Sequence, residues 1–144
     1  QIRNEAEKEE KLSYISRMSE EWLEDLMAIG TDWHKPFLEI APALIVVFKR
    51  SYEIMPDGKK RQNYYVSESV GLACGFLLAA IHHAGLAALT HTPSSMNFLA
   101  KILARPENEK PFLLIPIGYP SENALIPDIK RKTIDQIMVK YNAE

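Results

Sequence analysis

Residues 65–84 read YVSESVGLACGFLLAAIHHA, and this stretch decides the fold class. Its residues predict a helix that is apolar on nearly every side, and Gly85 is a natural stop for it. The alanines and glycines within the stretch allow neighbouring backbones to approach closely. Such a helix is central to a fold, so we expect the rest of the domain or a second subunit to bury it.

Three short apolar strands accompany this helix. Residues 43–48 form a continuous run rich in β-branched residues, typical of a strand buried on both faces. Residues 86–90 and 112–117 are the other two strands, and Pro116 favours a sheet edge or a bulge at the end of the last one. Because three strands make a thin sheet, we expect further strands from another chain or from a preceding segment.

Two further helices complete the expected elements. Helix-forming residues over 4–29 predict one long helix that ends at Gly30, and Pro93, Ser94 and Ser95 start another that ends near residue 104. Between the first strand and the central helix, residues 55–63 suggest a turn and an exposed loop. The alternation of helices and strands predicts an α/β or α+β domain.

The composition excludes several classes of protein. Seventeen Lys and Arg against nineteen Asp and Glu give a formal charge of −2, so we expect no nucleic-acid partner. The single cysteine, Cys74, cannot form an intramolecular disulfide and is expected to be an inert core residue. The longest apolar run, 70–81, is shorter than the ~20 residues of a membrane-spanning helix. His82 and His83 are adjacent, which is poor ligand geometry, so no metal site is expected.

Two places on the chain could carry chemistry. Glu10 and Tyr14 lie four residues apart on the polar side of the first helix and could present a carboxylate and a phenol to one ligand. A solvent-exposed Glu/Tyr pair explains the same pattern. Residues 90–93, Thr-His-Thr-Pro, stand where a strand meets a helix and could turn hydroxyls toward a ligand, although they would serve equally well as a helix cap.

Several ordered blocks of sequence resemble one family. They are Ala88–Pro93 (ALTHTP), Arg105–Pro111 (RPENEKP), Leu114–Pro120 (LIPIGYP), Pro127–Lys132 (PDIKRK) and Asp135–Met138 (DQIM). Together they resemble the C-terminal part of the iodotyrosine deiodinases, flavin enzymes of the nitroreductase superfamily. The likeness continues upstream to the first helix and so covers essentially the whole chain.

The resemblance implies a fold and an activity. The fold is an α+β, nitroreductase-like FMN-binding domain, with residues 1–144 supplying its lid helix, core and C-terminal arm. Members of this family are intertwined homodimers, which would give the apolar helix and the arm their partners. The implied reaction is the reductive dehalogenation of mono- and diiodotyrosine to tyrosine and iodide, with NADPH as the ultimate reductant.

The resemblance also implies two groups of site residues. Those that hold the amino-acid end of the halotyrosine are Glu10, Tyr14 and Lys35. Those that lie against the flavin are Thr90, His91, Thr92 and Arg131. One of the two threonines would hydrogen-bond near flavin N5 and so act in catalysis. For Lys35 the alternative is an ordinary surface cation.

The sequence departs from the family pattern in one respect. The family's Arg-Arg-Ser-x-Arg block for the FMN phosphate and its Pro-Ser-Gly-Ala turn do not occur in these 144 residues. We therefore expect this chain to be part of a longer one, whose missing portion would also hold any membrane anchor; the localisation is not predicted. We expect the isolated 144 residues to retain no FMN. Two alternatives remain: a generic flavin nitroreductase or quinone reductase, and a non-catalytic fragment that binds no flavin.

Overall fold

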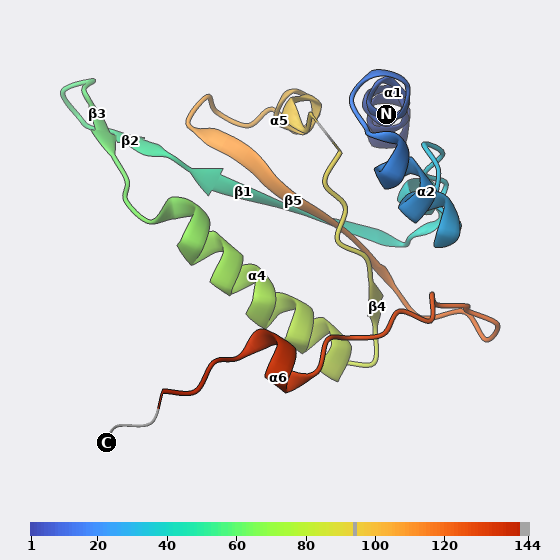
Figure 1. Cartoon of the computed structure of the whole chain (residues 1–144). Coiled ribbons are helices and arrows are strands. Elements are labelled where there is room, and N and C mark those ends of the chain that lie inside the picture. The colour runs from blue at the N-terminus through green and yellow to red at the C-terminus, as the bar shows by residue number, and fades with distance from the viewer. Residues whose placement is uncertain (94, 142–144) are drawn as a thin grey trace.

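A three-stranded antiparallel sheet forms the centre of the chain in the computed structural model, which describes residues 1–93 and 95–141 (Figure 1). The strand order is β1 (Ala43–Arg50), β5 (Glu109–Gly118) and β4 (Ala87–Ala88). The pairing of β1 with β5 runs from Ala43 opposite Ile117 to Arg50 opposite Glu109, with a bulge between Val47 and Phe48. All three expected strands are present: β1 and β5 are longer than predicted, and β4 is shorter. Strand β1 is half-buried within this chain rather than buried on both faces.

The expectation for Pro116 is wrong, because β5 is the central strand of the sheet. The Pro116 carbonyl accepts a hydrogen bond from the Leu89 N–H at 3.2 Å. In a strand the N–H and C=O of one residue point to the same side, so the donor that proline lacks would have faced β4. Because β4 is only two residues long, a missing donor on that side interrupts little regular pairing.

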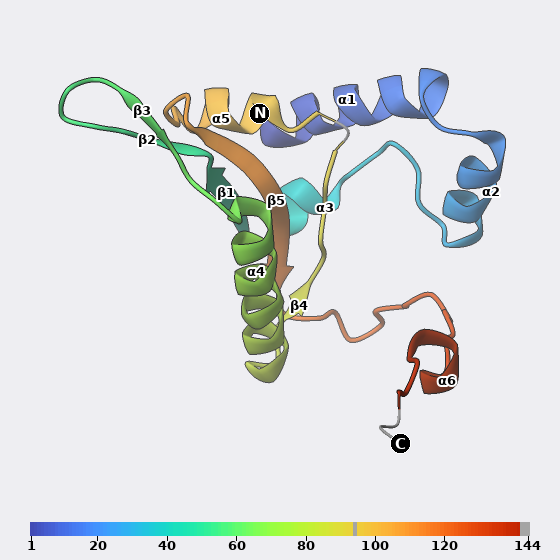
Figure 2. The same ribbon diagram turned by 60° about the vertical axis from the view of Figure 1, so that its left-hand side comes forward.

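Helices cover both faces of this sheet (Figure 2). On one face α1 (Ile2–Ser16), α3 (Phe37–Ile40) and α5 (Asn97–Ile102) pack through Ala6, Leu38 and Leu99 onto Leu114. On the other face α4 (Val66–His83) packs onto the side chains that alternate with Leu114 along β5, Leu113 and Ile115.

The single helix expected over 4–29 is wrong: α1 ends at Ser16, and α2 (Glu20–Ala28) starts anew. The Ser19 hydroxyl caps α2 by accepting a hydrogen bond from the Trp22 N–H at 3.2 Å, and this cap begins a second helix in a different direction. The expected burial is also reversed in α1, where Ile15 is 74% exposed while Glu10 and Ser13 are buried. The final turn is as predicted, with Gly30 at a φ of +70°.

Helix α4 is confirmed at nearly the expected bounds, but this chain does not bury it. Its Leu72 is 69% exposed and its Phe76 is 78% exposed. Among the described residues, α4 is also the one helix whose length and mean hydropathy, 1.3 over 18 residues, would suit a membrane crossing. This is weak evidence for a span, since the core helix of a soluble protein has the same length and composition.

The remaining segments differ from expectation mainly in length. The turn at 56–58 is confirmed, and it joins a hairpin of β2 (Tyr52–Ile54) and β3 (Lys60–Gln62). Strand β3 lies within the segment 55–63 that was expected to be a loop, and β2 was not predicted. Helix α5 begins four residues after Pro93, and Ser94, expected at its start, lies outside the described residues. The helix therefore starts later than the sequence predicts.

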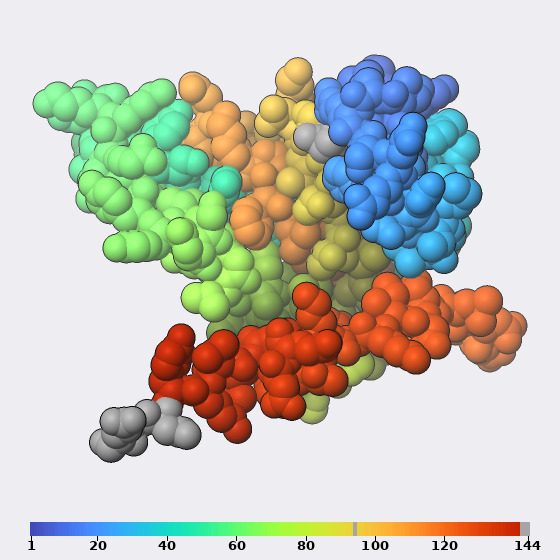
Figure 3. All heavy atoms as spheres, viewed as in Figure 1, coloured from blue at the N-terminus to red at the C-terminus, as the bar shows by residue number. Residues whose placement is uncertain are grey.

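The C-terminal arm after β5 leads away from the sheet and α4 in Figure 2, and in the view of Figure 3 it crosses the lower part of the molecule. It holds one short helix, α6 (Ile134–Ile137), which starts with a capping box at Thr133. Its apolar side chains are exposed, including Leu125 at 96%, Ile126 at 87% and Val139 at 73%. The arm therefore carries apolar surface that its own chain leaves open to solvent.

Candidate active-site cleft

A cleft of about 470 Å³ lies between the two N-terminal helices and residues 89–92, which follow β4. It brings together six of the seven site residues expected from the sequence, namely Glu10, Tyr14, Lys35, Thr90, His91 and Thr92. The break between α1 and α2 makes this possible, because it folds α2 back so that Trp22 and Leu26 line the same cleft as Tyr14.

Hydrogen bonds to the Lys35 backbone position this residue in the cleft. The Lys35 N–H donates to Glu7 Oε1 at 2.8 Å, and Glu7 is held in turn by Arg3 Nε at 2.9 Å. The Lys35 carbonyl then accepts from the Leu38 N–H and so begins the short helix α3. The position of the lysine is therefore fixed by α1 on one side and by α3 on the other.

The Lys35 side chain is buried, with only 5% of the residue exposed. Its ammonium donates to Thr31 Oγ1 at 3.3 Å and to the Asp32 carbonyl, and it lies 4.0 Å from Glu10 Oε2. It also stands 5.7 Å from the centre of the Tyr14 ring. The alternative of an ordinary surface lysine is therefore wrong: an acid, a phenol and an ammonium converge on one buried point.

Burial controls the protonation of the two acidic groups beside Lys35. It raises the pKa of the Glu10 carboxyl, and the Lys35 ammonium opposes that rise. Burial first and the Glu10 charge second raise the pKa of the Tyr14 phenol, whereas its hydrogen bond to Thr31 lowers it. Tyr14 is therefore an uncharged hydroxyl at neutral pH, able to donate or accept one hydrogen bond.

The Thr90–Thr92 segment is held rigidly against the central strand. The His91 N–H donates to the Leu114 carbonyl at 2.8 Å, and the Leu114 N–H donates to the His91 carbonyl at 3.1 Å. Side chains alternate along such an extended segment, so His91 is buried while Thr90 and Thr92 are exposed on its other side. The cleft wall thus carries two hydroxyls on a fixed backbone.

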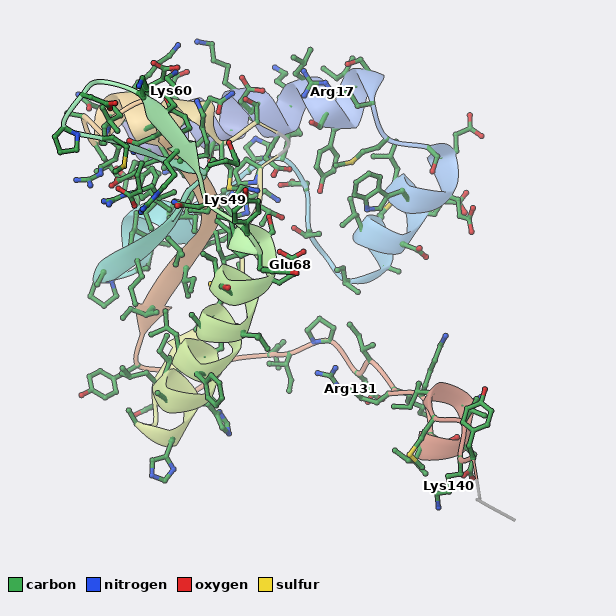
Figure 4. The ribbon with its side chains drawn as sticks, turned by 90° about the vertical axis from the view of Figure 1, so that its left-hand side faces the viewer. Arg17, Lys49, Lys60, Glu68, Arg131 and Lys140 are labelled. Atoms are coloured by element: carbon green, nitrogen blue, oxygen red, sulfur yellow. The ribbon has the colours of Figure 1, made fainter. Side chains whose placement is uncertain are left out.

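Arg131 is the expected site residue that does not line this cleft. It is exposed on the C-terminal arm, apart from α1 and α2 (Figure 4). Pro127, from the start of the same arm, does reach the cleft wall.

Part of the cleft lining was not expected from the sequence. It consists of the apolar side chains Met18, Trp22, Leu26 and Ile29. Trp22 and Leu26 reach the cleft only because the expected single helix breaks and α2 folds back, and the residue pattern did not predict that break. Within the described residues, no group of three His, Cys, Asp or Glu is placed to hold a metal ion.

The sequence and the structure of this chain are similar to those of known proteins. No protein-family model matches the sequence. The iodotyrosine deiodinase of Haliscomenobacter hydrossis is 70% identical over 140 residues, which cover 97% of this chain and 63% of that protein. A crystal structure of oxidized iodotyrosine deiodinase bound to FMN and 3-iodo-L-tyrosine matches with a TM-score of 0.77 and 32% identity, covering 99% of this chain and 69% of that one. The chain belongs to the iodotyrosine deiodinase family.

A relative from a distant organism matches this chain as well. The iodotyrosine deiodinase of Nematostella vectensis is 47% identical over 140 residues, covering 96% of this chain and 53% of that protein. The chain thus spans between about half and two thirds of the length of these iodotyrosine deiodinases. Its α+β fold class, expected from the sequence, is confirmed, and it is shared with an FMN-bound iodotyrosine deiodinase.

Proposed function

We propose that the protein is an FMN-dependent dehalogenase that converts mono- and diiodotyrosine to tyrosine and iodide, with NADPH as the ultimate reductant. The observation that carries this proposal is the convergence of Glu10, Tyr14 and Lys35 on one buried point of a cleft. Membership of the iodotyrosine deiodinase family, and a related structure bound to FMN and 3-iodo-L-tyrosine, support the choice of substrate and cofactor.

The three side chains match the amino-acid end of a halotyrosine. The Lys35 ammonium would pair with the substrate carboxylate, and the Glu10 carboxylate would pair with the substrate ammonium. Tyr14, whose ring centre lies 5.7 Å from the Lys35 ammonium, would add a hydrogen bond from its hydroxyl at the same end. Because Lys35 and Glu10 are buried, these charge-assisted contacts would be only weakly screened by water.

The exposed threonines fit the cofactor. Thr90 and Thr92 present hydroxyls from a rigid segment at the edge of the cleft, and either could donate a hydrogen bond near flavin N5. His91 would contact the flavin through its backbone, since its side chain is turned inward. Bound FMN would supply the reducing electrons, and Arg131 would reach it from the arm of a second subunit.

We also propose that the protein is a homodimer. Exposed Leu72 and Phe76 on α4 and the exposed apolar side chains of the arm support this proposal, because monomeric proteins rarely leave so much contiguous apolar surface to water. A partner subunit would cover the helix, and each arm would lie across the other subunit.

The affinity for diiodotyrosine tests the proposed function. Lys35→Ala in the native-length, flavin-loaded protein should weaken binding by one to two decades, since a charge-assisted hydrogen bond contributes about 1.5–3 kcal/mol. Lys59→Ala, a lysine whose side chain is 83% exposed on the hairpin, is the matched control and should bind like the wild type. Unchanged affinity in Lys35→Ala would remove the case for a halotyrosine and favour a generic flavin reductase. A colourless protein that takes up no FMN would favour a non-catalytic role.

A further inference from the structure

The imidazole of His91 lies in the wall of the cleft, and one of its ring nitrogens forms no hydrogen bond with the described residues. The residue is 7% exposed, and its Nε2 atom has no hydrogen-bond partner among the described residues. Leaving such an atom buried and unpaired costs on the order of 1–3 kcal/mol. An apolar side chain would avoid this cost, so the imidazole calls for an explanation beyond packing.

The contacts of the ring point to the lysine of the cleft. The His91 backbone is fixed to Leu114 by two hydrogen bonds, and its ring meets the Phe37 ring edge to face, with centroids 5.4 Å apart. Phe37 stands two residues after Lys35. The turn from 35 to 37 is therefore held by Glu7 at the Lys35 N–H and by His91 at the Phe37 ring.

Electrostatics adds a second link between the two residues. Burial first, and the Lys35 ammonium second, lower the pKa of His91 from 6.5 to about 4. The imidazole is therefore neutral at pH 7, and one of its ring nitrogens is an acceptor. A neutral ring places no second positive charge near the Lys35 ammonium, which lies 4.0 Å from Glu10 Oε2. The buried lysine therefore keeps its charge for the acidic groups of the cleft.

We propose that His91 is a positioning residue, whose imidazole holds the turn from Lys35 to Phe37 at a fixed separation from Thr90 and Thr92. This inference rests on the proposed function, because it concerns how a halotyrosine spans the cleft. Its amino-acid end would meet Lys35 while its ring lies near the threonines. His91 would link these two ends of the site without touching the substrate.

Two ligands that differ in one group test the proposal. 3-Iodotyrosine carries the carboxylate that Lys35 would bind, and 3-iodotyramine lacks it. We measure both dissociation constants by quenching of flavin fluorescence in the native-length, flavin-loaded protein. In the wild type, 3-iodotyrosine should bind at least tenfold more tightly than 3-iodotyramine. His91→Ala should reduce that ratio about tenfold, chiefly by weakening 3-iodotyrosine.

The variants are chosen so that a purely structural effect can be recognised. A structural role would weaken both ligands equally and leave their ratio unchanged, which would overturn the proposal. The double variant His91→Ala/Lys35→Ala should show the ratio of Lys35→Ala alone, because His91 acts through that lysine; additive losses would overturn it too. His83→Ala, an exposed histidine at the end of α4, should retain the wild-type ratio. If His91→Ala does not fold, His91→Leu, which fills the space but has neither an aromatic ring nor an acceptor, takes its place and should show the same reduced ratio.

The same measurement distinguishes a failure of the proposed substrate site from a failure of the proposed role of His91. A wild type that binds the two ligands equally would contradict the proposed substrate site itself. A wild type that discriminates, with a His91 variant that discriminates equally well, would contradict the role of His91 alone.

Discussion

The protonation of His91 should make the stability of the protein depend on pH between 6.5 and 4. The native state holds this ring neutral down to a pKa of about 4, whereas the unfolded chain protonates it near 6.5. Between these values the unfolded state binds more protons, so the free energy of unfolding must fall as the pH falls. Above pH 6.5 the ring is neutral in both states, so His91 causes no loss of stability there.

The size of the effect follows from the two pKa values. At pH 5, protonation of the unfolded chain at one such residue lowers the free energy of unfolding by about 2 kcal/mol relative to pH 8. Little of this should be screened, because the residue is only 7% exposed. Replacing the ring with a side chain that cannot be protonated removes the contribution.

Urea unfolding at pH 8 and pH 5, at one protein concentration, measures this contribution. From pH 8 to pH 5 the wild type should lose about 2 kcal/mol more than His91→Gln, on the basis of the linkage relation. The carboxyl groups titrate in both proteins and cancel in the comparison. His83→Gln, at an exposed site, should lose as much as the wild type. Equal losses in the wild type and His91→Gln would refute a neutral, buried imidazole.

Three further substitutions test the packing of the fold and the proposed subunit interface. Leu114→Ala, at a fully buried position of β5, should lower the free energy of unfolding by about 2–5 kcal/mol in urea titrations; a loss below 1 kcal/mol would contradict its central place. Gly118→Ala would bring a Cβ to 2.8 Å from the ring of Pro42, so it should lower the free energy of unfolding by about 1–3 kcal/mol. An unchanged thermal melting curve would show that Pro42 can move away from β5 without cost. Phe76→Arg, on the exposed face of α4, should convert the proposed dimer to monomer in light scattering, whereas an unaffected dimer would exclude this face from the interface.

The sequence was most informative where local chemistry decides the structure. The helix of α4, the strand of β1 and the helix end at Gly30 were all predictable, because residue type determines them directly. The break at Ser19 was not, since a serine within a helical pattern is either an interior residue or a cap, and only packing decides between them.

The same break explains why the site was predictable only in part. Periodicity places Glu10 and Tyr14 on one face of a helix, but it cannot say whether that face is buried. The structure buries Glu10 and leaves Ile15 exposed, the reverse of what polarity alone favours. The resemblance to the family supplied Lys35, because a lysine in a turn carries no sequence signal that it will be enclosed.

Helix α2 has no buried residue, in contrast to α1, which is anchored through Ala6. A segment with so little packing opens at a small free-energy cost, so its amides should exchange with deuterated solvent well before those of α1. Any ligand that needs Trp22 and Leu26 in place must first meet the entropic cost of ordering this segment. A substitution that stiffens α2 from its outer side would therefore tighten binding without adding a single contact to the ligand.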